Sequence, residues 1–269
     1  MEDEIIGFVG AGNMAGAIVN GIVGTKTFSP ERIYVFDIHK EKREALQTSA
    51  GVHTAESLIE LAQKCDILFL AVKPQNFPEV LADLKPAVSV QKLFVSIAAG
   101  ISSKYITDSL GCSCPVIRTM PNTPLLIGKG ATAMCRTENV SDHSFNLVKS
   151  LFSACGTVTV LEESQMNAVI SVSGSSPAYV YLFAKAIVDS AVKQGIDADT
   201  ALQLVCQTLE GSAGMLRQPD TTPKALIKMV SSKGGTTLKA LDVFYDRNFE
   251  QMIDDAMTAC TKRAEELGK

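Results

Sequence analysis

The feature that most constrains the fold is the run IIGFVGAGNMA at residues 5–15, where a β-rich apolar segment ends in two closely spaced glycines. A helical pattern follows at once, so the run predicts the strand, tight turn and helix of a dinucleotide-binding βαβ unit. Gly10 permits the turn, Gly12 lets a ligand approach the backbone, and Ala15 lets the helix pack on the strand. The alternative is a turn that only joins strand to helix. The expected cofactor-binding residues here are Gly10, Ala11, Gly12, Asn13 and Met14.

The first part of the chain alternates short apolar runs with amphipathic helical stretches. Such alternation predicts a mostly parallel sheet covered on both faces, a Rossmann-like α/β domain that we place at residues 1–162. The expected strands after the first are IYVFD, DILFLAVKP, KLFVSIAAG and PVIRTMPNTP, with GATAMCRT and GTVTVLEE at the far edge of the sheet.

From residue 163 to residue 269 the strand pattern disappears, and an all-helical second domain is expected. Residues 163–195 read as one long helix, a second helix has an aspartate start signal, and TPKALIKMV begins with a threonine cap and a proline. A last helical tract runs from residue 234 to residue 267. These helices are more apolar than a solvated bundle requires, so the domain is expected to bury surface against a second copy of itself.

Composition excludes several classes of protein. The 269 residues are 46% apolar and 20% charged with a net charge of −4, which argues against nucleic acid or an anionic membrane as the main partner. Polar residues interrupt every long apolar stretch, so no membrane span is predicted. Seven scattered cysteines are typical of reduced thiols, and they do not have the paired spacing of a metal site, so we expect a cytoplasmic protein without a metal. The acidic start MEDEIIGFVG lacks the pattern of a secretory signal.

Asp37, at the end of the second strand, is the expected partner of the adenine-side ribose. Its carboxylate would repel a 2′-phosphate, which favours NADH over NADPH, although His39, Lys40 and Lys42 nearby leave NADPH open. The alternative role for Asp37 is to cap the next helix. Three later loops follow strand ends, where they are expected to form a firm rim for the nicotinamide ribose. Their expected cofactor-binding residues are Ala71, Val72, Lys73, Pro74, Ala98 and Asn122.

Taken together, the motifs resemble the pyrroline-5-carboxylate reductase family over nearly the whole chain. The matching stretches are GFVGAGNMA, LAVKPQ at 70–75, SIAAGI at 96–101, RTMPNTP at 118–124, SVSGSSPAY at 171–179 and, most specifically, PKALIKMVSSKGGTTLKAL at 223–241. The resemblance implies an interlocked homodimer, in some members a decamer, that reduces L-1-pyrroline-5-carboxylate to L-proline with NADPH or NADH. It also implies that the loop at 232–237 meets the cofactor of the partner chain.

By the same resemblance, the substrate-binding residues are Ser232, Gly234, Gly235, Thr236 and Thr237. The small side chains of SGSSPAY further suggest that Ser175 and Ser176 line the wall near the substrate ring. A glycine turn that opens a helix offers backbone N–H groups to a carboxylate, and the Thr237 hydroxyl is placed as the catalytic group near the ring nitrogen. The alternatives are that both threonines only cap the last helix and that SGSSPAY only packs or kinks its helix. Two departures from the family pattern stand out: Lys233 replaces a frequent proline, and residues 54–61 lack a frequent asparagine, so no cofactor contact is assigned there.

Two other functions remain open from the sequence. A β-hydroxyacid-type dehydrogenase shares the glycine motif and the helical second domain but needs a catalytic lysine, and Lys185 and Lys193 read as helix-surface residues. A non-catalytic dinucleotide-binding redox sensor would not need the GGTT and MPNTP loops. Hydride transfer to a cyclic iminium depends mainly on position, which agrees with the absence of a catalytic histidine motif or a carboxylate pair.

Overall fold

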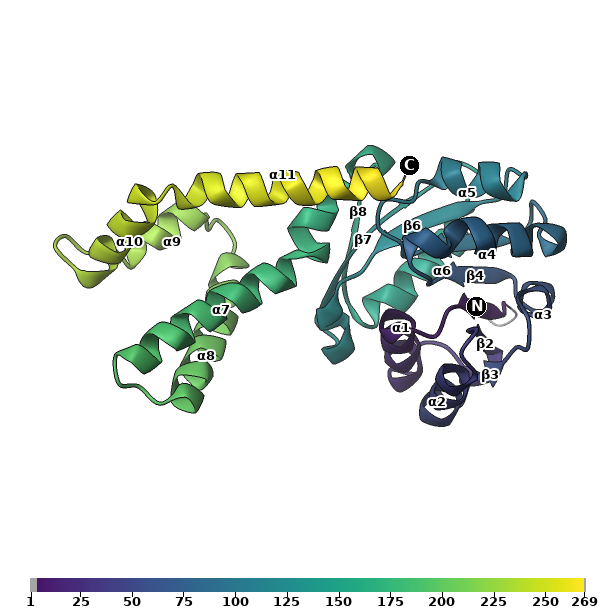
Figure 1. Cartoon of the computed structure of the whole chain (residues 1–269), viewed down its shortest axis with the longest axis horizontal. Helices are drawn as coiled ribbons and strands as arrows, with labels where there is room; N and C mark the ends of the chain where they lie inside the picture. The colour runs from purple at the N-terminus through teal and green to yellow at the C-terminus, as the bar shows by residue number, and fades with distance from the viewer. Residues whose placement is uncertain (1–3, 269) are drawn as a thin grey trace. The chain divides into compact units, whose positions relative to one another are not determined.

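An eight-stranded sheet organises the first part of the chain in the computed structural model, which describes residues 4–268 (Figure 1). The strands are β1 Ile6–Val9, β2 Ile33–Phe36, β3 His53–Thr54, β4 Ile67–Leu70, β5 Leu93–Ser96, β6 Val116–Met120, β7 Gly130–Arg136 and β8 Gly156–Val160. Their order in the sheet is β3-β2-β1-β4-β5-β6-β7-β8. Only the β6–β7 pairing is antiparallel, so the prediction of a mostly parallel sheet with two late strands at its far edge is confirmed.

Helices cover both faces of this sheet. They are α1 Asn13–Gly24, α2 Lys40–Ala50, α3 Leu58–Lys64, α4 Phe77–Leu84, α5 Ser103–Leu110 and α6 Asp142–Ser153. One apolar core joins the sheet to α1, α2 and α6, and a second joins it to α3, α4 and α5. At the centre, the rings of Phe8 and Phe69 stack with their centroids 4.6 Å apart, and both side chains are fully buried. Burial of the strands on both faces explains why they read as continuous apolar runs.

The chain forms two compact units rather than one continuous body. The first contains the residues up to Pro177 together with those from Ala259 onward, and the second contains Ala178–Thr258. The last helix, α11 Phe249–Leu267, therefore begins in the second unit and ends in the first. Gly100 shows how that end is held in the first unit: its φ is +82°, and a side chain there would overlap the Ala264 carbonyl oxygen. The glycine after β5 thus allows α11 to pack on this loop.

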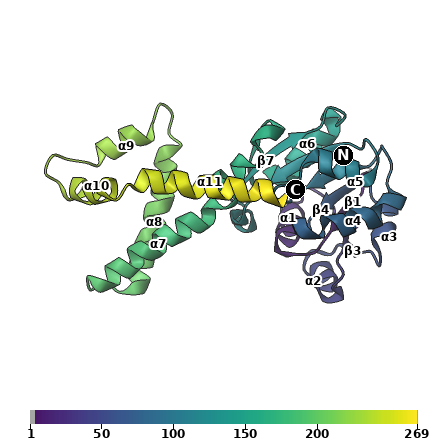
Figure 2. The same cartoon turned by 45° about the horizontal axis from the view of Figure 1, so that its top comes forward.

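The second unit is helical, as Figure 2 shows. Its elements are most of α7 Ser176–Lys193, then α8 Ala198–Leu216, α9 Pro223–Met229, α10 Thr236–Asp246 and the start of α11. The predicted start signals of α8 and α9 are confirmed, because Asp197 accepts a hydrogen bond from the Thr200 N–H at 3.1 Å and Thr222 accepts one from the Ala225 N–H at 3.2 Å.

The prediction of one long helix over 163–195 is wrong. The chain instead forms a 3₁₀ turn at Glu163–Gln165, a π-helix at Ile170–Gly174 and then α7. A β-carbon at Gly174 would lie 2.9 Å from the Met120 Cε, so the π-helix packs closely against the side chain at the end of β6. The last helical tract is likewise divided into α10 and α11 at Asn248, whose φ is +53°.

Large apolar side chains are exposed along the second unit, among them Leu182, Leu204 and Met229 at 68%, 59% and 68% exposure. Exposure on this scale is typical of a surface that a partner covers. None of the helices within residues 4–268 is long and apolar enough to cross a membrane.

Candidate functional site

The turn between β1 and α1 uses its two main glycines for different purposes. Gly10 has a φ of +105°, and a β-carbon there would lie 2.8 Å from the Ala71 carbonyl oxygen, so the fold itself requires glycine. Gly12 precedes α1 with a φ of −74°, and a β-carbon there would meet no atom within 4 Å. Packing within the chain therefore does not explain Gly12, whereas close approach by a ligand does.

Two helix starts beside this turn carry no side-chain cap. α1 begins after Gly12 and α2 after His39, and neither residue provides a side-chain acceptor to the first turn. By contrast, α3, α5 and α6 each have a serine cap that accepts a backbone N–H. Uncapped first turns leave N–H groups and the positive end of the helix dipole available to an anion. Both uncapped starts face the same cleft.

That cleft lies at the carboxyl ends of β1, β2 and β4 and has a volume of about 790 Å³. Six of the predicted cofactor residues line it: Gly10, Gly12, Asp37, Ala71, Val72 and Lys73. Its other lining residues are Val9, Phe36, Ile38, His39, Lys42, Glu56, Ser57, Leu58, Ile59, Gln75, Asn76, Glu79, Val80 and Asp83. The crevice outside strand ends is where open α/β sheets bind dinucleotides, and this volume is in the range of ligand sites.

Asp37 joins the end of β2 to the glycine turn. One carboxylate oxygen accepts the Ala11 N–H at 2.9 Å, and the other accepts both the backbone N–H and the Nδ1 of His39 at 2.9 Å. Burial opposes ionisation of this carboxyl, but these donors outweigh it, and the pKa of Asp37 lies below its ordinary value. The residue that precedes α2 is His39, so Asp37 is not the N-cap of that helix.

The remaining predicted cofactor residues lie outside the cleft lining. Ala11 donates to Asp37, while Asn13 and Met14 begin α1. Pro74 begins a 3₁₀ turn, and Ala98 is buried in the loop that follows β5. Sequence reasoning missed the wall formed by residues 56–59, which follows β3. β3 has two residues, which are too few to show the alternating or continuous apolar pattern of a strand. Its parallel pairing with β2 brings the loop that follows it to the cleft.

Asn122, in the loop after β6, acts as a brace between segments. Its side-chain nitrogen donates to the Ser173 carbonyl at 3.0 Å, and its side-chain oxygen accepts the Ala131 N–H at 2.9 Å. The amide thereby fastens the π-helix to the sheet. Ser175, at the end of that π-helix, donates its N–H to the Ile170 carbonyl at 2.7 Å, and its hydroxyl accepts the Cys260 thiol at 3.4 Å. π-Helical turns often occur at functional sites.

A buried ionic network holds the same segment further upstream. The Arg118 side chain on β6 is 7% exposed, lies 3.1 Å from the Glu163 carboxylate and donates to the Asn167 side-chain oxygen at 3.3 Å. The Ser103 N–H also donates to Glu163, at 2.8 Å. Burial opposes ionisation of this carboxyl, but the Ser103 and Arg118 donors lower the pKa of Glu163 below its ordinary value. Arg118 was not predicted as a site residue, and its charge inside an apolar strand was the available signal.

The predicted substrate loop lies between α9 and α10 in the second unit. The Gly235 N–H donates to the Ser232 carbonyl at 2.9 Å, and Gly234 between them has a φ of +75°. Gly235 is the N-cap of α10 and provides no side-chain cap. Thr236 and Thr237 follow inside the first turn, with Thr237 half-buried, so neither threonine is the capping residue. The loop thus presents an uncapped helix start, a glycine turn and the hydroxyl groups of three residues, Ser232, Thr236 and Thr237.

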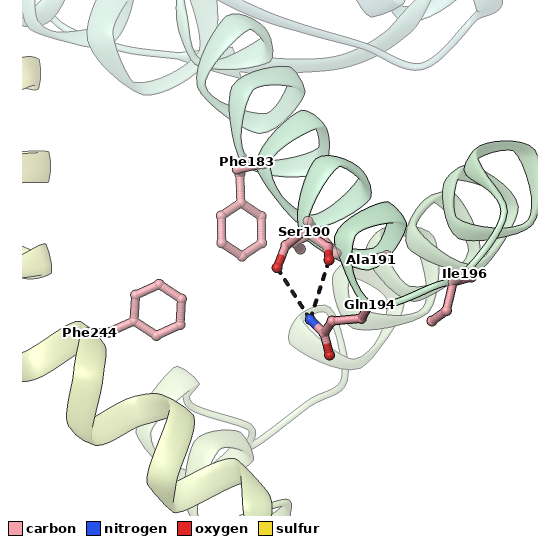
Figure 3. A pocket seen from close by; sticks show the side chains of 8 residues that line it. Phe183, Ser190, Ala191, Gln194, Ile196 and Phe244 are labelled. Carbon is pink, nitrogen blue, oxygen red and sulfur yellow. Dashed lines mark hydrogen bonds between the residues drawn. The ribbon is translucent and has the colours of Figure 1, made fainter.

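A second concavity lies wholly within the second unit, between α7 and α10 (Figure 3). Its volume is about 390 Å³, and Figure 3 shows the rings of Phe183 and Phe244 on its two sides. Its other lining residues are Ala186, Ile187, Ser190, Ala191, Gln194 and Ile196. The Gln194 side-chain nitrogen donates to the Ser190 hydroxyl and carbonyl, at 3.3 and 3.4 Å. The lining has no titratable group, so this groove suits apolar packing rather than catalysis.

Comparison with known proteins matches two family models to different parts of the chain. The family model described as pyrroline-5-carboxylate reductase dimerisation matches residues 163–267, and the one described as NADP oxidoreductase coenzyme F420-dependent matches residues 5–100. Pyrroline-5-carboxylate reductases of Escherichia coli strain K12 and Haemophilus influenzae are 38% and 39% identical over 99% of this chain, and the matches cover 99% and 98% of those proteins.

The crystal structure of Plasmodium falciparum pyrroline carboxylate reductase with NADP bound superposes with a TM-score of 0.92. The two chains are 30% identical, and the match covers 100% of each. The fold, the cleft and these matches define a nicotinamide-dinucleotide oxidoreductase with a helical dimerisation unit, which works as a homo-oligomer. More narrowly, the chain belongs to the pyrroline-5-carboxylate reductase family.

Proposed function

We propose that this protein reduces L-1-pyrroline-5-carboxylate to L-proline with NADPH or NADH, the final step of proline biosynthesis. Full-length relatives with this name support the proposal. The single observation that carries it is that the chain has two helix starts, at α1 and α10, in which a glycine stands where a side-chain cap would otherwise be. The first fits a dinucleotide phosphate, and the second fits a carboxylate.

The residues around the cleft fit the cofactor on structural grounds. The open space beside Gly12 is where a side chain would block a phosphate, and the uncapped start of α1 supplies donors for it. When bound, the reduced nicotinamide supplies the hydride. The protein contributes position: alignment of donor and acceptor carbons is worth roughly 7–11 kcal/mol in favourable cases. The carbon of the protonated imine accepts the hydride with its electron pair, and the ring nitrogen keeps its proton and becomes the amine of proline.

We place the substrate carboxylate at the first turn of α10. The first-turn N–H groups of Thr236 and Thr237 bind it, since the Gly235 N–H donates to the Ser232 carbonyl. Gly234 and Gly235 let the carboxylate approach the backbone, and the hydroxyls of Ser232 and Thr236 help to bind it. Thr237 is the catalytic residue, whose hydroxyl donates to the imine nitrogen or accepts from the iminium. Ser175 is proposed to border the substrate ring, since its hydroxyl accepts only a weak thiol donor, Cys260.

Cofactor preference depends on the end of β2. The Asp37 carboxylate would repel a 2′-phosphate, which supports a preference for NADH. His39 and Lys42 also line the cleft, and they provide positive charge for NADPH. We therefore propose that both cofactors are used, with NADH favoured. The other proposed cofactor contacts are Gly10, Ala11, Gly12, Asn13, Met14, Ala71, Val72, Lys73, Pro74, Ala98 and Asn122.

The exposed apolar helices of the second unit support assembly as a homodimer. We propose residues 163–269 as the substrate-binding and dimerisation domain, residues 1–162 as the cofactor domain, and the cytoplasm as the location. Light scattering at micromolar concentration separates the assemblies: a dimer or a decamer of five dimers agrees with the proposal, whereas a monomer contradicts it.

The activity test follows the loss of nicotinamide absorbance with purified protein, pyrroline-5-carboxylate and NADH or NADPH. Turnover of the imine supports the proposal. Turnover only with β-hydroxyacids would show a dehydrogenase of that type, and tight cofactor binding without turnover of either substrate would show a redox sensor.

The test of the catalytic assignment compares a variant that lacks the Thr237 hydroxyl with one that keeps a hydroxyl there. Thr237→Ala is expected to lower kcat/KM at least tenfold, because a hydrogen bond worth about 1.4 kcal/mol in the transition state corresponds to a factor of ten. Thr237→Ser, which keeps a hydroxyl at the same half-buried position, is the matched control and should retain most activity. Equal losses in both variants, or none in a folded Thr237→Ala protein, would refute the assignment.

A further inference from the structure

The segment around the substrate loop has an unusual distribution of charge. Residues 221–241 contain four lysines and no aspartate or glutamate, in a chain whose net charge is −4. All four side chains belong to exposed residues: Lys224, Lys228, Lys233 and Lys239. Lys239 lies 3.4 Å from the Asp242 carboxylate, and within residues 4–268 the other three form no ion pair. The segment therefore carries net positive charge at the surface.

Lys233 occupies the tip of the glycine turn itself. The hydrogen bond from the Gly235 N–H to the Ser232 carbonyl closes a four-residue turn with Lys233 second and Gly234 third. A left-handed third residue is the mark of a type II turn, and Gly234 has a φ of +75°. Proline is common at the second position of such turns because its φ is preset. A lysine at this position lacks the preset φ of proline, and it places a positive charge beside the uncapped start of α10.

We propose that Lys233 is a specificity-determining residue that attracts the carboxylate of the substrate to this turn. The inference rests on the proposed function, since it assumes that the α10 turn binds the carboxylate. An unpaired surface cation next to the binding point raises the local concentration of an anionic ligand and speeds its association. Because Lys233 is exposed, salt should screen its effect, with a Debye length that falls from about 30 Å at 0.01 M to about 10 Å at 0.1 M.

The test compares kcat/KM for pyrroline-5-carboxylate across ionic strength in four variants. Lys233→Gln removes the charge, Lys233→Pro removes it while favouring the turn, and Lys233→Arg keeps it. Lys193→Gln, at the end of α7, removes one exposed charge elsewhere in the same unit that forms no ion pair within residues 4–268. At low salt, the Gln and Pro variants should lose about threefold to tenfold in kcat/KM and show a flatter salt dependence. Lys233→Arg and Lys193→Gln should behave as the parent protein does.

Binding measurements make the inference independent of turnover. Titration of the cofactor-loaded protein with L-proline should show weaker binding in Lys233→Gln, with a smaller salt dependence than in the parent protein. Titration with L-prolinamide, which has no carboxylate, should be the same in both. A salt dependence of kcat/KM unchanged by Lys233→Gln would overturn the inference, and so would an equal loss with prolinamide or a loss only in cofactor affinity. Absence of turnover in the parent protein would instead refute the proposed function.

Discussion

Substituting the two glycines of the β1–α1 turn should separate a requirement of the fold from a requirement of the ligand. In Gly10→Ala, the new side chain faces the Ala71 carbonyl oxygen at 2.8 Å, and the backbone φ of +105° is strained for any L residue. Strain of this kind costs about 1–3 kcal/mol, and relief of the contact adds to it, so about 2–4 kcal/mol is expected. Since 1 kcal/mol shifts Tm by roughly 2–4 °C in domains of this size, Tm should fall by about 4–16 °C.

Gly12→Ala should leave the fold almost unchanged and impair cofactor binding. The added methyl meets no atom within 4 Å, and the φ of −74° suits alanine. Alanine is a poorer N-cap than glycine by up to about 1 kcal/mol, which the lower entropy of the unfolded chain largely offsets. Loss of one hydrogen bond to a charged phosphate oxygen costs about 1.5–3 kcal/mol and should weaken binding about 10- to 150-fold.

Two measurements on each variant test this reasoning. Differential scanning fluorimetry without ligand gives Tm, and titration followed by nicotinamide fluorescence gives the Kd of NADH and NADPH. The expected outcome is a low Tm for Gly10→Ala, and a nearly normal Tm with a raised Kd for Gly12→Ala. A Gly12→Ala protein that binds both cofactors as the parent does would refute the assignment of this turn to a ligand. Equal destabilisation by the two substitutions would show that the fold requires Gly12 as it requires Gly10.

Two further predictions concern carboxylates held by hydrogen bonds. The pKa of Glu163 is lowered in the fold, so its ionised form stabilises the protein above the ordinary glutamate range, and this stability is lost as the pH falls through the pKa of the folded state. Glu163→Gln should therefore reduce Tm at neutral pH and make Tm decline less steeply from about pH 5 to pH 3. A decline as steep as that of the parent protein would contradict this. Asp37→Ser retains an acceptor for the Ala11 N–H but removes the negative charge. The ratio of kcat/KM for NADPH to kcat/KM for NADH should therefore rise about tenfold or more. An unchanged ratio would show that Asp37 does not set the cofactor preference.

The sequence predicted most strands and helices of the α/β sheet because these elements follow from residues that are adjacent in the chain. The bounds of α1 follow from glycines at both ends, and the strands follow from continuous burial. The break inside residues 163–195 could not be predicted in this way. It depends on contacts across the fold, namely the approach of Met120 to Gly174 and the bond from Asn122 to the Ser173 carbonyl. An apolar, helix-compatible sequence does not reveal such contacts.

The same distinction applies to the candidate site. The roles of Gly10, Gly12 and Gly234 could be predicted from the sequence, because glycine itself indicates a tight turn or a close approach to the backbone. The wall at residues 56–59 reaches the cleft only through the pairing of a two-residue strand. Asn122 was expected to contact the cofactor, and the structure shows both ends of its amide bonded to backbone groups. The motif showed that Asn122 has a constrained role, and its hydrogen bonds show that part of this role is structural.

The two helix starts assigned to ligands differ from other helix starts of the chain in their N-cap residue. Serine, aspartate or threonine side chains cap α3, α5, α6, α8 and α9, so this sequence readily places such residues where a helix needs them. Glycine stands at that position only in α1 and α10 among these seven helices. Replacing a good cap by glycine costs a few tenths of a kcal/mol and leaves the first-turn N–H groups without a partner. Under the proposed function, a ligand anion would restore those partners, and the unmet hydrogen bonds at each helix start would contribute to binding a phosphate at α1 and a carboxylate at α10.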